Sequence, residues 1–562
     1  MSSRNVAALN ASHLARSEGQ VVGCVIAAVF FAGLALGLPV LIRRRLHSYR
    51  VVVVRPDPAK PERPTKPVSV GVVGGGLAGI AAAEALARRG VAVTLFEAQP
   101  YLGGKLGAWT VDVAGESVWV SHGFHAFFDH YYNLNRFLDR LGLRARHRSI
   151  GEYVVIARNG ERLRFGRRRE APGLNLLALA ARGAFPVAPV LRAPLRDLMG
   201  LFLEYDPTRT HRELDHLSLA DLDAVAPLPR GLKTAFNTFA RAFFAHESEL
   251  SLAELVKSFH FYYLSHDRGL IYGYPADEYE RSLLLPIRSH LQALGVRLRL
   301  NTPVAQLERA GTLRINGEAF DQVVLAADAA ATKQIMDGAQ GLPSLFPDRS
   351  ALRAGRPYAV LRLWTDRDIP ADLPGFVITD RHTLLDAVAA VHRLEADSRR
   401  WVDRHGGAVL ELHCYAVPDG FDEASIRAQL IAEAGLIFPA LQGLAIRAEH
   451  LQLKRDFTAF HVGMHAARPG TESGEEGVHL AGDWVRLPFP AMLMEAAHAS
   501  GLLAANAILA SLGLREELVE AVPQRGLLAD APVPPARGRW LAEMAEHQAA
   551  ALAPRDSPRP AE

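Results

Sequence analysis

Apolar runs and alternating apolar–polar runs divide the chain into segments of different kinds. Val21–Ile42 is a continuous apolar run without a charged residue. Residues 68–96 hold two short β-branched runs around an Ala-rich stretch, which is the pattern of a strand–helix–strand unit. Residues 295–327, 358–364 and 408–417 alternate instead, which predicts strands with two different faces. Together these patterns predict an α/β fold behind an apolar N-terminal segment.

The apolar run at 21–42 predicts one transmembrane helix. A helix of this length reaches about 33 Å, enough to cross a hydrocarbon core of about 30 Å. Arg43–Arg45 follow it in place of a small-residue signal-peptide cleavage site, whereas Pro39 favours the alternative of a buried core helix. Basic residues are more numerous after the run than before it. This bias predicts a single-pass membrane protein with residues 1–20 outside and the catalytic body in the cytoplasm.

Two further segments differ in composition from the body. Residues 43–67 are predicted to be a basic, Pro-rich linker, because Arg55–Pro67 has the sequence RPDPAKPERPTKP, typical of extended and solvated chain. Residues 523–562 are rich in Pro, Ala and Arg and are predicted to be mostly disordered, with one short helix around 540–552.

A glycine-rich turn after the first predicted strand carries the strongest chemical signal. Val68–Val73 leads into GGGLAG, an Ala-rich helix, and a second strand that ends at Glu97. Gly74 permits the tight turn, Gly76 lets the backbone approach a pyrophosphate, and Gly79 lets helix and strand pack closely. The helix N-terminus attracts the anion, and Glu97 is placed to bind a ribose diol. An ordinary strand–helix–strand turn is the alternative. The predicted dinucleotide-binding residues are Gly74, Gly76, Leu77, Ala78, Gly79 and Glu97.

The residues after this unit favour FAD over NAD as the cofactor. The glycine pattern alone fits either of them. The block GGGLAGIAAAEALARRGVAVTLFEAQPYLGGK ends in Gly103-Gly104-Lys105. It resembles the flavin amine oxidase and phytoene desaturase superfamily, in which such a Gly-Gly-Arg/Lys element lies beside FAD. Lys105 stands where arginine is commoner. The resemblance implies FAD as the cofactor and adds Gly104 and Lys105 to its site.

A second block with the same resemblance lies near the end of the body. Residues 478–509 predict a short strand that stops at Gly482-Asp483 and a long helix of small residues from about 491. A carboxylate at a strand end can bind a sugar hydroxyl, and a helix N-terminus stabilises negative charge. The resemblance implies that Gly482 and Asp483 meet the ribityl and phosphate groups and that Met494 and Glu495 face the flavin pyrimidine. A purely structural strand–helix unit is the alternative.

The region between the blocks completes the predicted domain plan. Residues 295–327 predict a β-meander with an Asn316-Gly317 turn, and the resemblance places Val304 at the adenine. We predict a FAD-binding Rossmann-like domain of the glutathione-reductase type with an inserted substrate domain of mixed sheet and helices. The FAD-binding domain comprises residues 68–150, 285–345 and 455–512, and the substrate domain comprises residues 151–284 and 346–454.

Two apolar regions bear on the substrate. Residues 171–205 are strongly apolar with dispersed arginines, which suits either a lipid interface or a helical cap over a cavity. His122, His125 and His130 lie among aromatic residues in SHGFHAFFDHYY, as cavity lining or ordinary packing, and no further ligands indicate a metal site. With these stretches, the body is most similar to bacterial carotenoid desaturases of the type that forms aromatic end rings.

The resemblance implies an oxidoreductase acting on CH–CH groups of a carotenoid or other isoprenoid. Flavin N5 takes a hydride, a proton leaves the neighbouring carbon, and quinone or oxygen is the final electron acceptor. His122 and His125 are candidates for the base, which stays unassigned. The alternatives are a FAD-dependent amine oxidase, a flavin-dependent carotenoid isomerase or cyclase without net oxidation, and a membrane-tethered flavoprotein without catalysis.

Composition narrows the classes of function. The chain has 63 basic and 60 acidic residues, a net charge of +3, so it lacks the basic surplus of nucleic-acid-binding proteins. The two cysteines, Cys24 and Cys414, cannot build a disulfide scaffold or a four-cysteine metal site. Neither lies near the C-terminus, where some amine oxidases attach their flavin. A hydrophobic content of 49% supports more than one core.

Overall fold

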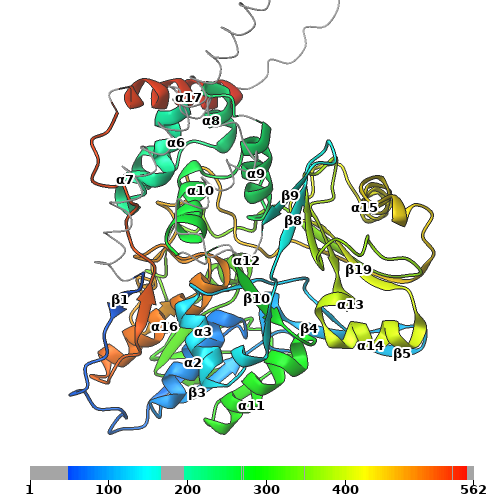
Figure 1. Cartoon of the computed structure of the whole chain (residues 1–562). Helices are drawn as coiled ribbons and strands as arrows, with labels where there is room; N and C mark the ends of the chain where they lie inside the picture. Colours follow the sequence, from blue (N-terminus) through cyan, green and yellow to red (C-terminus); the bar gives the residue numbers. More distant parts are fainter. Residues whose placement is uncertain are drawn as a thin grey trace, which may run out of the picture.

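The computed structural model describes residues 49–165 and 195–552, apart from 229, 267, 268, 270, 347 and 535. The predicted spanning run at 21–42 and most of the apolar stretch at 171–205 lie outside the described residues. Three regions are visible in Figure 1: a sheet with helices at the lower left, a group of helices above it, and a second sheet at the right.

The first region is built on a five-stranded sheet of order β11-β3-β2-β15-β21, in which every pair is parallel. The predicted strand–helix–strand unit is confirmed as β2, α2 and β3. On one face α2 and α16 pack so closely that a Cβ on Gly501 would lie 2.1 Å from the carbonyl oxygen of Ala78. The elements are β2 (Ser69–Val73), α2 (Leu77–Arg88), β3 (Ala92–Phe96), β11 (Arg297–Arg299), β15 (Gln322–Leu325), β21 (Val478–Leu480) and α16 (Leu493–Ser511).

A small antiparallel sheet covers the other face and confirms the predicted meander. Its strands are β12 (Leu307–Ala310), β13 (Thr312–Ile315) and β14 (Glu318–Phe320), followed by α12 (Ala329–Asp337). Asn316 and Gly317 form the turn with φ of 48° and 83°, the left-handed geometry that Asn-Gly hairpins need. Apolar side chains from β13 and β14 fill the space over β2, where a Cβ on Gly71 would clash with Ile315.

The second sheet has seven strands in the order β20-β16-β19-β18-β17-β8-β9. Alternation along β19 places leucines at 410 and 412 against α15, and Glu411, His413 and Tyr415 on the opposite face. That opposite face turns toward the first region. The elements are β8 (Tyr153–Ile156), β9 (Arg162–Phe165), β16 (Tyr358–Thr365), β17 (Phe376–Thr379), β18 (Ala387–Ala390), α13 (Val391–Leu394), α14 (Ala396–His405), β19 (Ala408–Cys414), α15 (Glu423–Ile437) and β20 (Ile446–Lys454).

The helical region includes a segment that the sequence predicted to be mostly disordered. The short helix expected around 540–552 is confirmed as α17, residues 537–552, which packs on α8. The expected disorder is wrong for residues 523–534, where the N–H groups of Gly526 and Leu528 donate to Tyr205 and Leu203. The buried side chains of Trp540 and Met544 anchor α17, and His547 Nδ1 lies 2.6 Å from Asp221 Oδ1. The helices are α6 (Leu195–Leu203), α7 (Pro207–Leu214), α8 (Leu219–Val225), α9 (Arg230–Arg241), α10 (Leu252–Phe259), the π-helix η3 (His260–Leu264) and α17 (Arg537–Leu552).

The prediction of an extended linker at 43–67 is wrong for residues 51–54. Val51–Val54 forms β1, which pairs antiparallel with β22 (Val519–Ala521), because four consecutive β-branched residues favour a strand. Residues 55–67 are largely exposed, as expected of solvated chain, and Lys60 pairs with Glu516 at 2.8 Å. The chain entering the body is therefore attached to the chain leaving it.

The remaining elements connect these regions. Among the described residues α16 is the one helix long and apolar enough to cross a membrane, and 67% of its apolar window is buried, as in a core helix. The connecting elements are η1 (Gly104–Leu106), β4 (Ala108–Val113), β5 (Glu116–Ser121), β6 (Phe127–Phe128), α3 (Tyr132–Arg140), η2 (Arg144–Arg146), β7 (His147–Ser149), β10 (Tyr272–Pro275), the π-helix η4 (Glu280–Leu284), α11 (Leu285–Ala293) and η5 (Pro439–Leu441).

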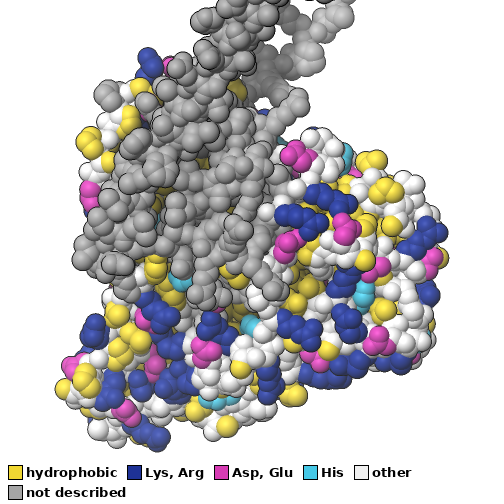
Figure 2. Space-filling view, viewed as in Figure 1, with side chains coloured by type: hydrophobic (Ala, Val, Ile, Leu, Met, Phe, Trp, Pro, Cys, Tyr) yellow, Lys and Arg dark blue, Asp and Glu magenta, His cyan; other side chains and the backbone are white. Residues whose placement is uncertain are grey.

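Basic and acidic side chains are mixed on the face shown in Figure 2, where lysines and arginines stand beside aspartates and glutamates. On the outside of the second sheet, Arg393 pairs with Asp368 at 2.7 Å and Arg162 pairs with Asp372 at 2.7 Å. Such pairs neutralise the basic side chains locally.

Candidate active site

One cavity of about 1100 Å³ extends from the glycine turn after β2 to the inner face of the seven-stranded sheet. It brings together segments that are hundreds of residues apart in the chain. Of the residues predicted to meet FAD, Gly79 and Glu495 do not line it. The cavity is lined by the others: Gly74, Gly76, Leu77, Ala78, Glu97, Gly104, Lys105, Val304, Gly482, Asp483 and Met494.

The three glycines of the turn have different physical roles. Gly74 has φ of 109°, and a Cβ there would lie 2.6 Å from the carbonyl oxygen of Ala326. A Cβ on Gly79 would lie 1.9 Å from the carbonyl oxygen of Gly74, so Gly79 serves helix–strand packing. Gly76 has extended backbone, and a Cβ there would come no closer to protein than 4.0 Å, to Gly104 Cα. Only Gly76 thus leaves open space at the start of α2.

Glu97 closes the same end of the cavity. Its carboxylate accepts hydrogen bonds from the backbone N–H of Gly75 at 2.6 Å and of Gln99 at 2.8 Å. Burial raises the pKa of Glu97, although these N–H groups act to lower it. The carbonyl of Glu97 accepts from the N–H of Thr302, which places the segment carrying Val304 beside the carboxylate. A ribose hydroxyl entering here would meet an acceptor already fixed by the backbone.

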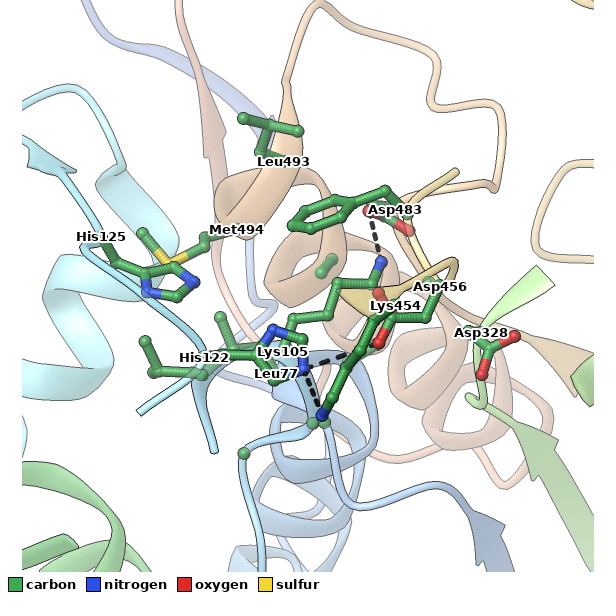
Figure 3. A pocket seen from close by; sticks show the side chains of 18 of the residues that line it. Leu77, Lys105, His122, His125, Asp328, Lys454, Asp456, Asp483, Leu493 and Met494 are labelled. Atoms are coloured by element: carbon green, nitrogen blue, oxygen red, sulfur yellow. Dashed lines mark hydrogen bonds and ion pairs between the residues drawn. The ribbon is translucent and has the colours of Figure 1, made fainter. Parts of the chain in front are cut away.

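The other end of the predicted FAD site lies just after β21. Gly482 has φ of 146°, and its N–H donates to Ser500 Oγ at 2.8 Å. Asp483 Oδ2 accepts from Lys105 Nζ at 3.2 Å (Figure 3). Asp483 Oδ1 accepts from Thr458 Oγ1 at 2.7 Å. Burial lowers the pKa of Lys105, but Asp483 and Asp456 outweigh it, and the net pKa is raised. The lysine therefore stays charged inside the cavity.

The start of α16 is held by a buried carboxylate. Glu495 accepts from the N–H of Asn133 at 2.9 Å and from the N–H of Leu134 at 3.1 Å, which ties α16 to α3. Leu493 has φ of 48°, an unusual conformation for a residue other than glycine, and lines the cavity with Met494. Backbone strain is thus located where the resemblance places the flavin.

Glu495 makes the free energy of unfolding depend on pH. Burial raises its pKa from 4.5 to about 7, despite the N–H groups that lower it. The raised pKa favours the folded state most at acid pH, and about 3 kcal/mol of this stability is lost as pH rises from 4.5 to 7. In urea denaturation we expect the unfolding free energy of the wild type to fall by about this amount relative to that of Glu495→Gln over that range, because the neutral amide does not titrate. Parallel pH profiles would contradict the assignment.

A polar cluster lies between the glycine turn and the second sheet. Tyr358 OH and His122 Nδ1 are 2.6 Å apart, and Lys454 Nζ donates to His122 Nε2 at 3.1 Å. Asp456 lies 3.6 Å from the same nitrogen (Figure 3). Burial, together with Lys454, holds the pKa of His122 well below its usual range. His122 is therefore a neutral ring whose acceptor nitrogen is already used.

Aromatic rings enclose the rest of the cavity. Tyr131 OH and Tyr262 OH are 2.9 Å apart, and Phe124 stacks on Phe376 with ring centroids 4.6 Å apart. A long apolar molecule would fit this lining. The aromatic lining residues are Phe124, Phe128, Tyr131, Phe243, Phe244, Tyr262, Tyr263, Tyr272, Tyr358, Phe376, Tyr415 and Phe457.

The three histidines of the aromatic block take different positions. His125 lines the cavity, and its Nδ1 lies 2.8 Å from the carbonyl oxygen of Gly123. His130 is buried against Phe261, with ring centroids 4.6 Å apart. Their ligand atoms do not converge, and within the described ranges the cluster with metal-ligand spacing is His211, Glu254 and His465.

The His211 cluster already has its charge balanced. Lys257 forms an ion pair with Glu254, and Arg468 lies 3.4 Å from the same carboxylate. Burial acts to raise the pKa of Glu254, but attraction to Lys257 and Arg468 outweighs it and holds the pKa well below its usual range. A cation bound there would meet two positive side chains, so we assign the cluster a structural role.

Comparison with known proteins identifies the family. A model of the flavin containing amine oxidoreductases matches residues 77–509, which begins directly after Gly76 and includes Glu97, Lys105 and Asp483. The chain belongs to this family. The FAD that the family name implies is consistent with the cavity: open space at Gly76, a fixed acceptor at Glu97, and a charged lysine beside Asp483.

Among members of the family, the chain is similar to enzymes named for carotenoids. It is 36% identical to the carotenoid phi-ring synthase of Streptomyces griseus over 85% of this chain and 95% of that protein. It is 28% identical to the carotenoid phi-ring synthase of Chlorobaculum tepidum, over 83% of this chain and 92% of that protein. The 15-cis-phytoene desaturase of Solanum lycopersicum is 24% identical over 79% and 78%. The chain is thus a FAD-dependent oxidoreductase of the carotenoid desaturase type.

Two solved oxidase structures share the fold. Putrescine oxidase bound to putrescine has a TM-score of 0.57 at 18% identity, covering 80% of this chain and 100% of that one. Cyclohexylamine oxidase from Brevibacterium oxydans has a TM-score of 0.55 at 15% identity, covering 80% and 100%. These similarities confirm a Rossmann-like FAD domain with a substrate domain.

The sequence did not indicate several cavity residues on the second sheet. Tyr358, His413 and Lys454 line it from β16, β19 and β20, with Asp456 just beyond β20. The alternation at 408–417 predicted a strand with two faces, and a histidine on one face was the available signal. Which face would turn toward the cofactor depends on sheet packing.

Proposed function

We propose that this protein is a FAD-dependent desaturase that forms C=C bonds in the end ring of a carotenoid. The observation that carries the proposal is the similarity to carotenoid phi-ring synthases over nearly their whole length. The aromatic lining of the cavity supports it, because such a surface favours a long apolar substrate over a soluble amine.

FAD would lie between the two ends of the cavity. Its adenosine and pyrophosphate would occupy Gly74 to Ala78, Glu97 and Val304, and the ribityl and flavin groups would occupy the second end. When bound, FAD accepts a hydride at N5 and so oxidises a C–H bond. Final electron transfer to quinone or oxygen is part of the proposal. The residues of the second end are Gly104, Lys105, Gly482, Asp483 and Met494.

The chain's own contribution is binding and exclusion of water. The aromatic walls remove water from the substrate and hold the ring, which raises the effective concentration of the reacting carbon. Lys105 and Asp483 neutralise each other, so this pair presents no net charge to an apolar ring. An amine oxidase would favour a cavity that stabilises an ammonium substrate, and this remains the competing function.

We expect cells that accumulate carotenoids with cyclic end groups to form a new pigment when they express this chain. Each new double bond removes two hydrogen atoms, so mass spectrometry separates desaturation from isomerisation or cyclisation. A change of absorption with unchanged mass would indicate isomerisation. Unchanged pigment in every background, with peroxide released from amines, would contradict the proposal in favour of an amine oxidase.

We also propose that residues 21–42 anchor the protein in a membrane with the body in the cytoplasm. The uncharged run followed by Arg43–Arg45 supports this placement. A membrane site would give direct access to a lipid-dissolved substrate. The anchor is tested by deleting residues 1–48: the shortened chain is expected to leave the membrane fraction, and unchanged fractionation would contradict it.

A further inference from the structure

One face of β19 directs polar groups toward the cavity. Glu411, His413 and Tyr415 alternate with Leu410 and Leu412, whose side chains pack in the apolar core beneath α15. His413 and Tyr415 line the cavity, and Glu411 is fully buried behind them. A buried carboxylate in a strand of this kind requires partners.

His413 faces that carboxylate with one nitrogen. Its Nε2 lies 3.3 Å from Glu411 Oε2. The opposite edge of the ring faces Gly123, where an added Cβ would lie 3.3 Å from Cε1 and 3.8 Å from Nδ1 of His413. Gly123 also lines the cavity, and its φ of 118° is a geometry that side chains disfavour. Nε2 of His413 therefore faces the carboxylate at ion-pair distance without a hydrogen bond of standard geometry, and the edge of the ring that carries Nδ1 lies on the Gly123 side of the cavity.

Glu411 stays ionised where it is buried. Arg362 lies 2.8 Å from Glu411 Oε1 through Nη2, leaving Oε2 to His413. Burial acts to raise the pKa of Glu411, but Arg362 and His413 outweigh it and lower the pKa to about 2. A fixed negative charge behind an imidazole stabilises the imidazolium that forms when the ring accepts a proton.

The other two cavity histidines lack this arrangement. Nε2 of His122 accepts from Lys454, so a proton arriving there would displace a cation. His125 bonds the carbonyl of Gly123 through Nδ1, and burial lowers its pKa to about 4. Of the three, His413 has the shortest contact between a ring nitrogen and a carboxylate oxygen, at 3.3 Å, whereas the His122 nitrogen that lies 3.6 Å from Asp456 already accepts from Lys454.

Resting on the function proposed above, we propose that His413 is the catalytic base of the desaturation and that Glu411 is its positioning residue. One C–H bond of the substrate leaves as hydride, with its electron pair, to the flavin. The C–H bond on the neighbouring carbon breaks with its proton moving to Nδ1 of His413. The electron pair left behind becomes the new π bond, and the imidazolium later returns its proton to solvent.

The test follows the anaerobic loss of flavin absorbance when the full-length, FAD-loaded protein is mixed with a cyclic carotenoid that the wild type converts. We expect His413→Ala to slow this reduction by about 100-fold or more, the usual range for loss of a general base. Added imidazole is expected to accelerate His413→Ala by about tenfold and to leave the wild type unchanged. Rescue of this kind reports proton transfer, which a structural role for His413 does not explain.

Glu411 has a matched control in the same network. Glu395 also approaches Arg362, at 3.5 Å, and burial raises its pKa to about 7, so Gln imitates its neutral form. We expect Glu411→Gln to slow flavin reduction by about tenfold or more, with partial recovery in Glu411→Asp, and Glu395→Gln to stay within about twofold of wild type.

Binding measurements separate this inference from structural damage and from the proposed function. Carotenoid binding to the apoprotein, measured from the shift of the pigment's absorption band, should be the same in His413→Ala and wild type. Reduction of His413→Ala at the wild-type rate would overturn the inference. Slow reduction without imidazole rescue and with weakened pigment binding would overturn it too. If no carotenoid reduces the wild type, the proposed function itself fails.

Discussion

Gly76→Ala is expected to leave the apoprotein as stable as wild type and to weaken FAD binding by about 100-fold, or about 2.7 kcal/mol. The backbone of Gly76 is extended, and a Cβ there meets only open space in the protein. That space lies at the N-terminus of α2, where a pyrophosphate would approach. The added methyl group therefore should not destabilise the apoprotein, and it would clash only with a bound cofactor.

Gly79→Ala provides the contrast. A Cβ at Gly79 would lie 1.9 Å from the carbonyl oxygen of Gly74, so this variant should lose stability with or without FAD. Thermal denaturation of both apoproteins and FAD titration by fluorescence measure the two effects separately. Equal FAD affinity in Gly76→Ala and wild type would show that the turn does not hold the pyrophosphate.

Arg362→Met is expected to destabilise the protein by about 3–5 kcal/mol, because it leaves a buried carboxylate without its cation. Arg362 is 2% exposed and bonds Glu411 through Nε at 2.9 Å. It also donates to the carbonyl of Trp119 at 3.1 Å, which joins β16 to β5. Methionine keeps the volume of the side chain, so the loss is chiefly electrostatic. Urea denaturation measures it.

Two variants test this explanation. Arg362→Met combined with Glu411→Gln should recover part of the lost stability, because the buried charge is removed with its partner. Arg162→Met removes an ion pair whose side chains are 41% and 59% exposed, and it should cost less than about 1 kcal/mol. A similar loss in both arginine variants would contradict a special role for burial.

The parts of the fold that sequence predicted well are those set by local pattern. The β-branched run before Gly74, the Ala-rich helix and the turn at Asn316-Gly317 each carry their own geometric requirement. The residues predicted for both ends of the FAD site came from such local motifs. Their meeting through Lys105 and Asp483 depended on the resemblance to a known superfamily, because the two residues are 378 positions apart.

The parts that were missed depend on tertiary contacts. Composition suggested a mostly disordered tail at 523–562 with a short helix around 540–552, but it did not indicate that Trp540 and Met544 of this helix occupy buried positions beside α8. The valines of β1 found a partner in β22, at the far end of the body. Likewise, the pairing of His413 with Glu411 follows from strand alternation, but its place in the cavity depends on how the two sheets pack.

The central claim is that one FAD extends from the glycine turn at Gly74 to the strand end at Asp483. Titration of the apoprotein with FAD and with FMN, read by flavin fluorescence, tests it most directly. FMN lacks the adenosine that Glu97 and Val304 would hold, so we predict one tightly bound FAD per chain and far weaker binding of FMN. A colourless protein that takes up neither flavin, or one that binds both equally, would contradict the claim.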